Sequence, residues 1–323
     1  MATTLLMMPP QNEKSREWAQ RVADAIPEIE VIVPETMEGA EQAIGQADGA
    51  FGRIPPALLA RADRLRWLQA PQAAPPAGFY YPELIAHPVV ITNMREIYND
   101  HIGAHVMAFV LAFARGLHLY LPQQLRREWR PAGRESGDVV HLPEATVLVV
   151  GVGGIGAEVA RLASAFGMRV IGIDERRTAP PLGVAELHRS AALDEQLPRA
   201  DFVILTVPHT PETDGFMNRA RFRRMKKTAF FINIGRGMTT RLDDLAAALQ
   251  AGEIAGAGLD VFEQEPLPAE HPLWTLPGVL ITPHTAGYGP YLDERRYEVF
   301  ADNCRRFLAG EPLRNLIDKS RWF

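Results

Sequence analysis

Three side chains of different chemistry each follow an apolar segment in the second half of the sequence. Arg236 lies in FFINIGRGMTTRLDDL, Glu265 in GAGLDVFEQEPLP and His284 in LITPHTAGYGP. If the apolar segments are strands of one parallel sheet, the three side chains meet at its carboxyl edge, where open α/β folds bind ligands. A guanidinium there can hold the carboxylate of a 2-keto acid and polarise its carbonyl group. An imidazolium can donate a proton near neutral pH, and a neighbouring carboxylate would raise its pKa and fix its ring.

A glycine-rich stretch, GVGGIG, stands between a β-branched run and a helical pattern. The first glycine allows a tight turn, the second leaves room for a pyrophosphate, and the last lets helix and strand pack closely. The N-terminus of the following helix presents free N–H groups to the phosphates. The stretch therefore predicts a dinucleotide site rather than a bare turn. The residues that we expect to bind the cofactor here are Gly151, Gly153, Gly154, Ile155 and Gly156.

The choice between NAD and NADP depends on three residues after the next predicted strand. Asp174 can accept hydrogen bonds from the ribose hydroxyl groups, which favours NAD and repels a 2′-phosphate. Arg176 and Arg177 could instead bind that phosphate if Asp174 swings aside. We expect NAD(H) ahead of NADP(H), with NADP(H) or dual use as the alternative, and we expect no metal site.

Five stretches together resemble the D-isomer-specific 2-hydroxyacid dehydrogenase family: GVGGIG with GID, LTVPHTPETDGFMN, INIGRG, GAGLDVFEQEPLP and ITPHTAG. The resemblance covers essentially the whole chain. It implies an NAD(P)-dependent oxidoreductase for 2-keto acids such as glyoxylate, hydroxypyruvate or pyruvate, and it implies that Arg236, Glu265 and His284 are catalytic. Further cofactor contacts that we expect are Pro208, Thr210, Ile234, Asp260 and Gly287. Asp260 has a second interpretation, in which it only terminates its strand.

The predicted substrate loop departs from the family pattern. Where relatives usually show a loop of the type Ser-Ala-Gly-Val-Asp, this chain has QAAPP, which begins at Gln72. Ala73 and Ala74 can still donate backbone N–H groups to a substrate carboxylate, whereas the two prolines cannot. We expect Gln72, Ala73, Ala74, Arg236 and His284 to bind the substrate. These residues leave the identity of the substrate's own side chain open. Arg95, Tyr98 and His101 either face the substrate or belong to a hinge and helix cap.

The spacing of apolar runs predicts an α/β protein with two doubly wound parallel-sheet domains. The larger, a Rossmann dinucleotide-binding domain, spans residues 101–287 and is inserted into the smaller. The smaller, a discontinuous flavodoxin-like substrate domain, comprises residues 1–100 and 288–323, joined by a charged helix within 288–310. One apolar helix is predicted over residues 101–120. Because its apolar residues cover most of its circumference, we expect it to be buried between domains or subunits.

The composition and charge of the chain limit the classes of partner and the cellular compartment that we expect. Of 323 residues, 23% are charged and the formal net charge is −5, which argues against nucleic acid as a partner. Cys304 is the only cysteine, so a reducing compartment fits. The N-terminus lacks a signal-peptide pattern, and the apolar run at 106–114 is far shorter than a membrane span. We expect a cytoplasmic homodimer that forms through the cofactor domain, near Trp129, without a membrane partner.

Two alternative functions stay open. The same fold could serve an NAD(H)-sensing binding protein, because a fold does not determine a function. The same chemistry could also act on a phosphorylated hydroxy acid. The acid–base trio favours an enzyme, since a sensor needs no proton donor.

Overall fold

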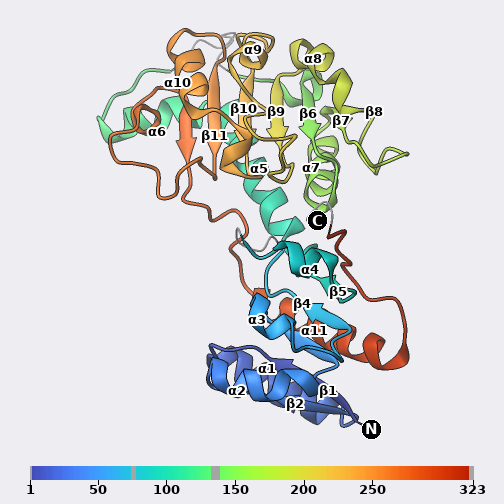
Figure 1. The fold of residues 1–323 in the computed structure, drawn as a ribbon. Coiled ribbons are helices and arrows are strands. Elements are labelled where there is room, and N and C mark those ends of the chain that lie inside the picture. The colour runs from blue at the N-terminus through green and yellow to red at the C-terminus, as the bar shows by residue number, and fades with distance from the viewer. Residues whose placement is uncertain (1, 74–77, 132–138, 320–323) are drawn as a thin grey trace. The chain divides into compact units, whose positions relative to one another are not determined.

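The computed structural model describes residues 2–73, 78–131 and 139–319. The chain forms two compact units (Figure 1). The first, called unit 1 below, combines Met1–Ile97 with Pro290–Phe323, and the second, unit 2, is the continuous stretch Tyr98–Gly289.

Unit 1 is built on a five-stranded parallel sheet with the order β2-β1-β3-β4-β5. This is the order of flavodoxin-like folds. Its strands are β1 (Thr3–Met7), β2 (Ile29–Ile32), β3 (Gly49–Phe51), β4 (Trp67–Gln69) and β5 (Val90–Thr92). Its helices are α1 (Glu13–Ala25), α2 (Met37–Ala43), α3 (Pro56–Leu59), α4 (Pro82–Ala86) and α11 (Leu292–Ala309).

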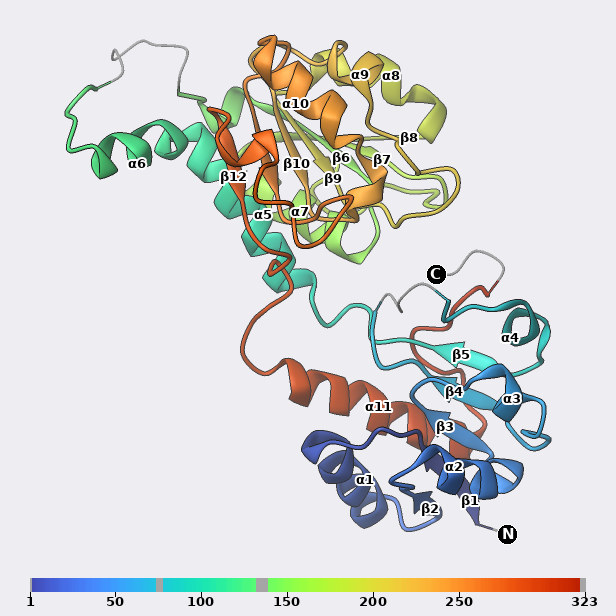
Figure 2. The same ribbon diagram turned by 60° about the vertical axis from the view of Figure 1, so that its left-hand side comes forward.

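The two faces of this sheet are covered by different helices (Figure 2). Helices α2, α3 and α4 share one apolar cluster with Leu6 of β1 and Leu68 of β4. Trp67, the neighbour of Leu68, points to the opposite face, where its ring lies 6.2 Å from Phe300 and 5.3 Å from Phe307 of α11. Since successive strand residues face opposite sides, α11 completes the second face of a sheet whose strands all come from the first 97 residues.

Unit 2 is built on a seven-stranded parallel sheet with the order β12-β11-β10-β9-β6-β7-β8 (Figure 1). Counted from β6, this is the Rossmann order with one further strand. The strands are β6 (Thr146–Val150), β7 (Arg169–Ile173), β8 (Glu186–His188), β9 (Phe202–Leu205), β10 (Phe230–Asn233), β11 (Gly256–Leu259) and β12 (Val279–Ile281). The helices are α5 (Asn99–Ala114), α6 (Leu117–Leu125), α7 (Gly154–Ala165), α8 (Leu193–Gln196), α9 (Arg219–Phe222) and α10 (Leu242–Gln250). The predicted fold class, two parallel-sheet α/β domains, is confirmed.

Alternate strand residues separate the core of unit 2 into two layers. Phe231 packs with Phe222 of α9 at a ring distance of 5.3 Å, in the cluster that also includes α10. Its neighbour Phe230 stacks on Phe113 of α5 at 4.5 Å, in the cluster that includes α7. Figure 2 shows α8, α9 and α10 on one face of the sheet and α5 and α7 on the other. Both faces are therefore buried, as continuous apolar strands require.

The prediction of one helix over residues 101–120 is wrong. The chain forms α5 and α6, which are bent by 75° at the break. Gly116 between them has φ of +70°, a left-handed conformation that ends a helix and that glycine adopts without strain. No single helix in the described ranges is long and apolar enough to cross a membrane; α5 and α6 meet the length and composition criteria only as a bent pair.

Candidate active site

The predicted functional residues of unit 2 follow the carboxyl ends of six parallel strands. The glycine stretch follows β6, Asp174 follows β7, and Pro208 and Thr210 follow β9. The three candidate catalytic residues follow β10, β11 and β12, which are neighbours in the sheet. Because every strand is parallel, all of these segments leave the sheet at one edge.

The glycine stretch has the close contacts that its sequence predicts. Gly151 has φ of +92°, and a β-carbon on Gly156 would lie 2.0 Å from the Gly151 carbonyl oxygen. A β-carbon on Gly153 would meet no described protein atom within 4 Å, so its missing side chain opens to free space. Gly153 is the N-cap of α7, whose first N–H groups can bind an anion. This backbone fits the pyrophosphate of a dinucleotide.

Asp174 lies at the end of β7 with its carboxylate turned toward the backbone. One oxygen accepts the Val152 N–H at 2.8 Å, and the other accepts the N–H groups of Arg176 and Arg177, each at 2.9 Å. Burial alone would raise the pKa of Asp174, but these three donors outweigh it and hold the pKa below its ordinary value. The side chains of Arg176 and Arg177 are exposed beside it, and Arg177 Nε donates to the Val152 carbonyl.

Arg236 occupies a turn that its neighbours hold in place. Its carbonyl accepts hydrogen bonds from Asn233 Nδ2 at 3.2 Å and from Thr239 Oγ1 at 2.6 Å. The flanking Gly237 is packed so closely that a β-carbon there would lie 1.8 Å from the backbone of Phe262. Burial lowers the pKa of the Arg236 guanidinium, and the negative charge of Glu265 opposes this effect. The guanidinium is thus a partly buried cation near a carboxylate, without a carboxylate partner of its own among the ion pairs of the described residues.

Glu265 and His284 form a direct pair. Glu265 Oε1 accepts the backbone N–H of Phe262 at 3.0 Å, and Oε2 lies 2.7 Å from His284 Nδ1. Since a carboxylate only accepts, Nδ1 carries the hydrogen and Nε2 is the ring nitrogen left for a ligand. The His284 side chain is 50% exposed and that of Glu265 is 37% exposed, so the pair is accessible to a small molecule.

Asp260 holds the turn that carries His284. Its carboxylate is buried and accepts three hydrogen bonds: from Thr282 Oγ1 at 2.6 Å, from the Thr285 N–H at 2.8 Å and from the Ala286 N–H at 2.9 Å. His284 between these donors has φ of +54°, an uncommon value for a residue with a side chain. The three bonds stabilise this conformation. They also agree with the structural interpretation of Asp260, whose nicotinamide contact stays a prediction.

The other predicted cofactor residues lie on the same edge. Thr213 Oγ1 bridges the loop after β9, because it donates to the Pro208 carbonyl and accepts from the Thr210 N–H, both at 2.7 Å. Ile234 is buried after β10, and Gly287 lies under the Tyr98 ring. Their contacts with a cofactor stay predictions.

The predicted substrate loop belongs to unit 1. The Ala73 carbonyl accepts a hydrogen bond from Asn93 Nδ2 at 2.8 Å, and the Gln72 carbonyl accepts one from the Met94 N–H at 3.4 Å. Ala74 lies outside the described residues. Arg95 donates to the Leu316 carbonyl at 2.9 Å, within unit 1.

Tyr98 and His101, at the start of α5, belong to unit 2 and contact the segment after His284. A β-carbon on Gly289 would lie 2.3 Å from the His101 ring, and one on Gly287 would lie 3.5 Å from the Tyr98 ring. Both residues therefore pack against glycines, which is compatible with the hinge interpretation.

Sequence reasoning missed three residues that shape this edge. Asn233 and Thr282 position the backbone beside Arg236 and His284, and His105 of α5 hydrogen-bonds Thr282 at 2.9 Å. The available signal was a histidine within an otherwise apolar helix, together with polar residues directly at the ends of apolar strands.

Comparison with known proteins agrees with this geometry. Residues 107–286 match the family described as "D-isomer specific 2-hydroxyacid dehydrogenase, NAD binding domain". The chain is 34% identical over 304 residues to glyoxylate/hydroxypyruvate reductase B of Klebsiella pneumoniae strain 342, covering 91% of this chain and 92% of that protein.

Two solved structures are similar over nearly the full length of the chain. The D-isomer specific 2-hydroxyacid dehydrogenase of Xanthobacter autotrophicus Py2, in complex with NADPH and MES, gives a TM-score of 0.85 at 29% identity and covers 100% of both chains. The NADPH-dependent glyoxylate/hydroxypyruvate reductase of Sinorhizobium meliloti, in complex with NADP and sulfate, gives 0.81 at 28% identity and covers 99% of this chain and 100% of that one. The chain is an oxidoreductase with an NAD-binding domain, and it belongs to the D-isomer specific 2-hydroxyacid dehydrogenase family.

Proposed function

We propose that this protein reduces a small 2-keto acid of the glyoxylate and hydroxypyruvate class to the corresponding D-2-hydroxy acid. The observation that carries the proposal is the 2.7 Å pair of Glu265 Oε2 and His284 Nδ1. Arg236 supports it as a cation at the adjacent strand end, with a guanidinium near Glu265. The names of the similar reductases from Klebsiella and Sinorhizobium agree with this substrate class.

Each residue has a defined role in the proposed reaction. Arg236 binds the substrate carboxylate and polarises the neighbouring carbonyl group. His284 donates a proton from Nε2 to the carbonyl oxygen, and Glu265 fixes the orientation of the ring through Nδ1. A bound nicotinamide supplies the hydride, and the glycine stretch with the start of α7 would hold its pyrophosphate.

The substrate class is tested by following the oxidation of NADPH and NADH with glyoxylate, hydroxypyruvate and pyruvate. We expect turnover with at least one of the first two. H284A should bind the dinucleotide as the unchanged protein does and lose at least about a hundredfold in kcat, because general acid catalysis supplies a factor of that size. Turnover of no keto acid in the panel by the unchanged protein would reject the proposal, and would favour the sensing function instead.

We further propose that the preferred cofactor is NADP(H), contrary to the expectation from sequence. Asp174 favours NAD only if its oxygens are available to the ribose, and both already accept backbone N–H groups. Arg176 and Arg177 are exposed beside it and present positive charge to a 2′-phosphate. NADPH and NADP in the structures from Xanthobacter and Sinorhizobium agree with this proposal.

A double variant tests the cofactor preference. R176A/R177A should raise the KM for NADPH at least about tenfold, because each charge-assisted bond contributes about 1.5–3 kcal/mol, and should change the KM for NADH little. R169A is the control for the loss of a single positive charge, since it removes one guanidinium from the opposite end of β7, where Arg169 pairs with Glu186. Equal effects on the two cofactors, or a lower KM for NADH in the unchanged protein, would contradict the proposal.

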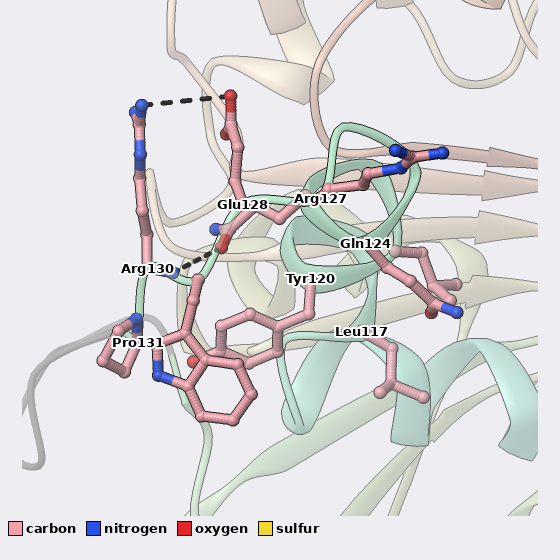
Figure 3. Close-up of a pocket in the computed structure, with 10 residues that line it drawn as sticks. Leu117, Tyr120, Gln124, Arg127, Glu128, Arg130 and Pro131 are labelled. Carbon is pink, nitrogen blue, oxygen red and sulfur yellow. Dashed lines mark hydrogen bonds and ion pairs between the residues drawn. The ribbon is translucent and has the colours of Figure 1, made fainter.

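We also propose that α6 and the residues that follow it, up to Pro131, bind a second copy of the chain. Leu125 and Trp129 are 87% and 95% exposed. Beside them lies a hollow of about 620 Å³, lined by Leu117, Tyr120, Leu121, Gln123, Gln124, Arg127, Glu128, Trp129, Arg130 and Pro131 (Figure 3). A surface that presents both apolar side chains and a hollow can be complementary to itself across a two-fold axis.

The oligomeric state, measured by light scattering after size-exclusion chromatography, tests this surface. The unchanged protein should be a dimer, and L125E should be a monomer, because the substitution buries a charge at the interface. L182E is the control, since Leu182 is 79% exposed and lies outside the surface around α6. A monomeric unchanged protein, or a dimer that survives L125E, would contradict the proposal.

A further inference from the structure

Helix α5 packs against β11 and thereby places His105 beside Asp260. A β-carbon on Gly258 would lie 2.8 Å from the Phe109 ring, so Phe109 fills the space above this glycine. Residues two apart on a strand face the same side, and residues four apart on a helix share a face. His105, one turn before Phe109, therefore lies beside Asp260, two residues beyond Gly258. The His105 and Phe109 rings meet edge to face at 4.9 Å.

The hydrogen bonds of His105 have a defined direction. Thr282 Oγ1 donates its single hydrogen to Asp260 Oδ1 across 2.6 Å, so it can only accept from His105 Nε2, 2.9 Å away. Burial lowers the pKa of His105, although Asp260, 3.8 Å from Nε2, opposes the effect. A neutral imidazole with its hydrogen on Nε2 satisfies both observations, and it directs a partial positive charge at the buried carboxylate.

We propose that His105 is a positioning residue that holds the His284 turn in its reactive conformation through Thr282 and Asp260. The proposal rests on the proposed function of His284 as proton donor. Within the part of the chain that the structure describes, His105 contacts Thr282, Asp260 and Phe109, so its effect on His284 passes through the Asp260 carboxylate.

Backbone conformation explains why such support is needed. His284 has φ of +54°, which is an unfavourable conformation for a residue with a side chain. Asp260 balances this cost with its bonds to the N–H groups of Thr285 and Ala286. The Asp260 carboxylate can keep both bonds only while its orientation is fixed. The Thr282 hydroxyl fixes this orientation by donating to Asp260, and His105 holds the hydroxyl by donating to it. A displacement of the imidazole by about 1 Å can cost a hundredfold in rate.

The test compares two substitutions at one position. H105F keeps a ring of similar size but cannot donate, whereas H105Q places an amide N–H near the position of Nε2. We expect H105F to lower kcat about tenfold or more while the KM for the cofactor changes less than about twofold, and H105Q to recover most of the loss. H141F is the control, since His141 is an exposed residue of unit 2 that contacts none of these groups.

Hydrogen exchange of the Thr285 and Ala286 amides gives a second measurement that needs no turnover. Both amides should exchange faster in H105F and in T282V, and at nearly the original rate in H105Q and T282S. The double variant H105F/T282V should be no worse than the worse single variant, because both act through one contact. Unchanged exchange in H105F, or H105Q as impaired as H105F, would overturn the proposal. Faster exchange without any keto acid turnover in the unchanged protein would leave the positioning contact standing and reject the proposed function alone.

Discussion

At the scale of single residues, two glycines of the carboxyl edge differ in what surrounds them. A β-carbon on Gly153 meets no described atom within 4 Å, whereas one on Gly237 would lie 1.8 Å from the Phe262 backbone. We predict that G153A keeps its melting temperature but binds NADPH at least about tenfold more weakly, because the methyl group fills space reserved for phosphate. G237A should be destabilised by about 3 kcal/mol, the upper part of the range for overpacking.

Thermal unfolding and a cofactor titration on the same two variants check this pair. A G153A protein with unchanged affinity would show that the dinucleotide does not approach this glycine. A G237A protein as stable as the original would show that the turn around Arg236 adapts.

Asp174 should make stability depend on pH. Its three backbone donors hold its pKa below the ordinary value in the folded chain. A lowered folded pKa contributes stability that is complete above the unfolded value of about 4 and disappears as pH falls through the folded value. We predict that D174N is destabilised by about 2 kcal/mol at neutral pH and that this difference shrinks below about pH 4. Melting temperatures of both proteins between pH 3 and 7, about the carboxyl range, measure it; a difference that does not depend on pH would contradict the assignment.

The sequence predicted which side chains lie at the ends of apolar strands, but it did not predict most of their hydrogen-bond partners. Glu265 and His284 were predicted to pair and do so at 2.7 Å. The orientation of the Asp174 carboxylate was not predictable, because it depends on the turn that places three backbone N–H groups around it. His105 was missed because a polar residue in a largely apolar helix gives no sign of which strand it will face.

At the scale of elements, the two series of parallel strands were predicted, whereas strand β8 and the break between α5 and α6 were not. Strand β8 has three residues, all half-buried, and therefore lacks the apolar run by which a strand is recognised. The apolar pattern of α5 continues into α6, so only the left-handed Gly116 marks the bend.

Helix α11 offers an element-scale prediction, because it carries the only cysteine of the chain. Cys304 is buried, and burial raises the pKa of its thiol, so a thiol reagent should not react with the folded protein. Phe300, one turn away, packs on Trp67 and Phe51. We predict that F300A costs about 3–5 kcal/mol and speeds labelling of Cys304 accordingly, while cofactor affinity, a property of unit 2, is unchanged. Labelling of F300A at the original rate would show that α11 stays docked without this ring.

At the scale of the whole molecule, unit 2 is one continuous segment, whereas unit 1 uses both ends of the chain. The alternation of strands and helices predicts a substrate domain of residues 1–100 and 288–323 and a cofactor domain of residues 101–287, because a second series of strands follows the apolar helix. The ligand site is likewise predicted at the carboxyl edge of the sheet, since open parallel sheets bind ligands there. Which side chains stabilise that edge depends on packing between segments far apart in sequence, such as α5 and β12.

The path of the chain has a consequence for its synthesis. A ribosome releases residues 1–97 first, yet their sheet lacks the helix that covers one face until residues 292–309 emerge. The inserted unit can complete itself in the meantime, because all of its strands precede residue 290. Residues 1–97 thus leave Trp67 uncovered until that helix is synthesised, and chaperones can bind this exposed apolar surface. Translation arrested just after residue 289 should yield a chain that retains dinucleotide affinity but is cut by protease within its first 97 residues.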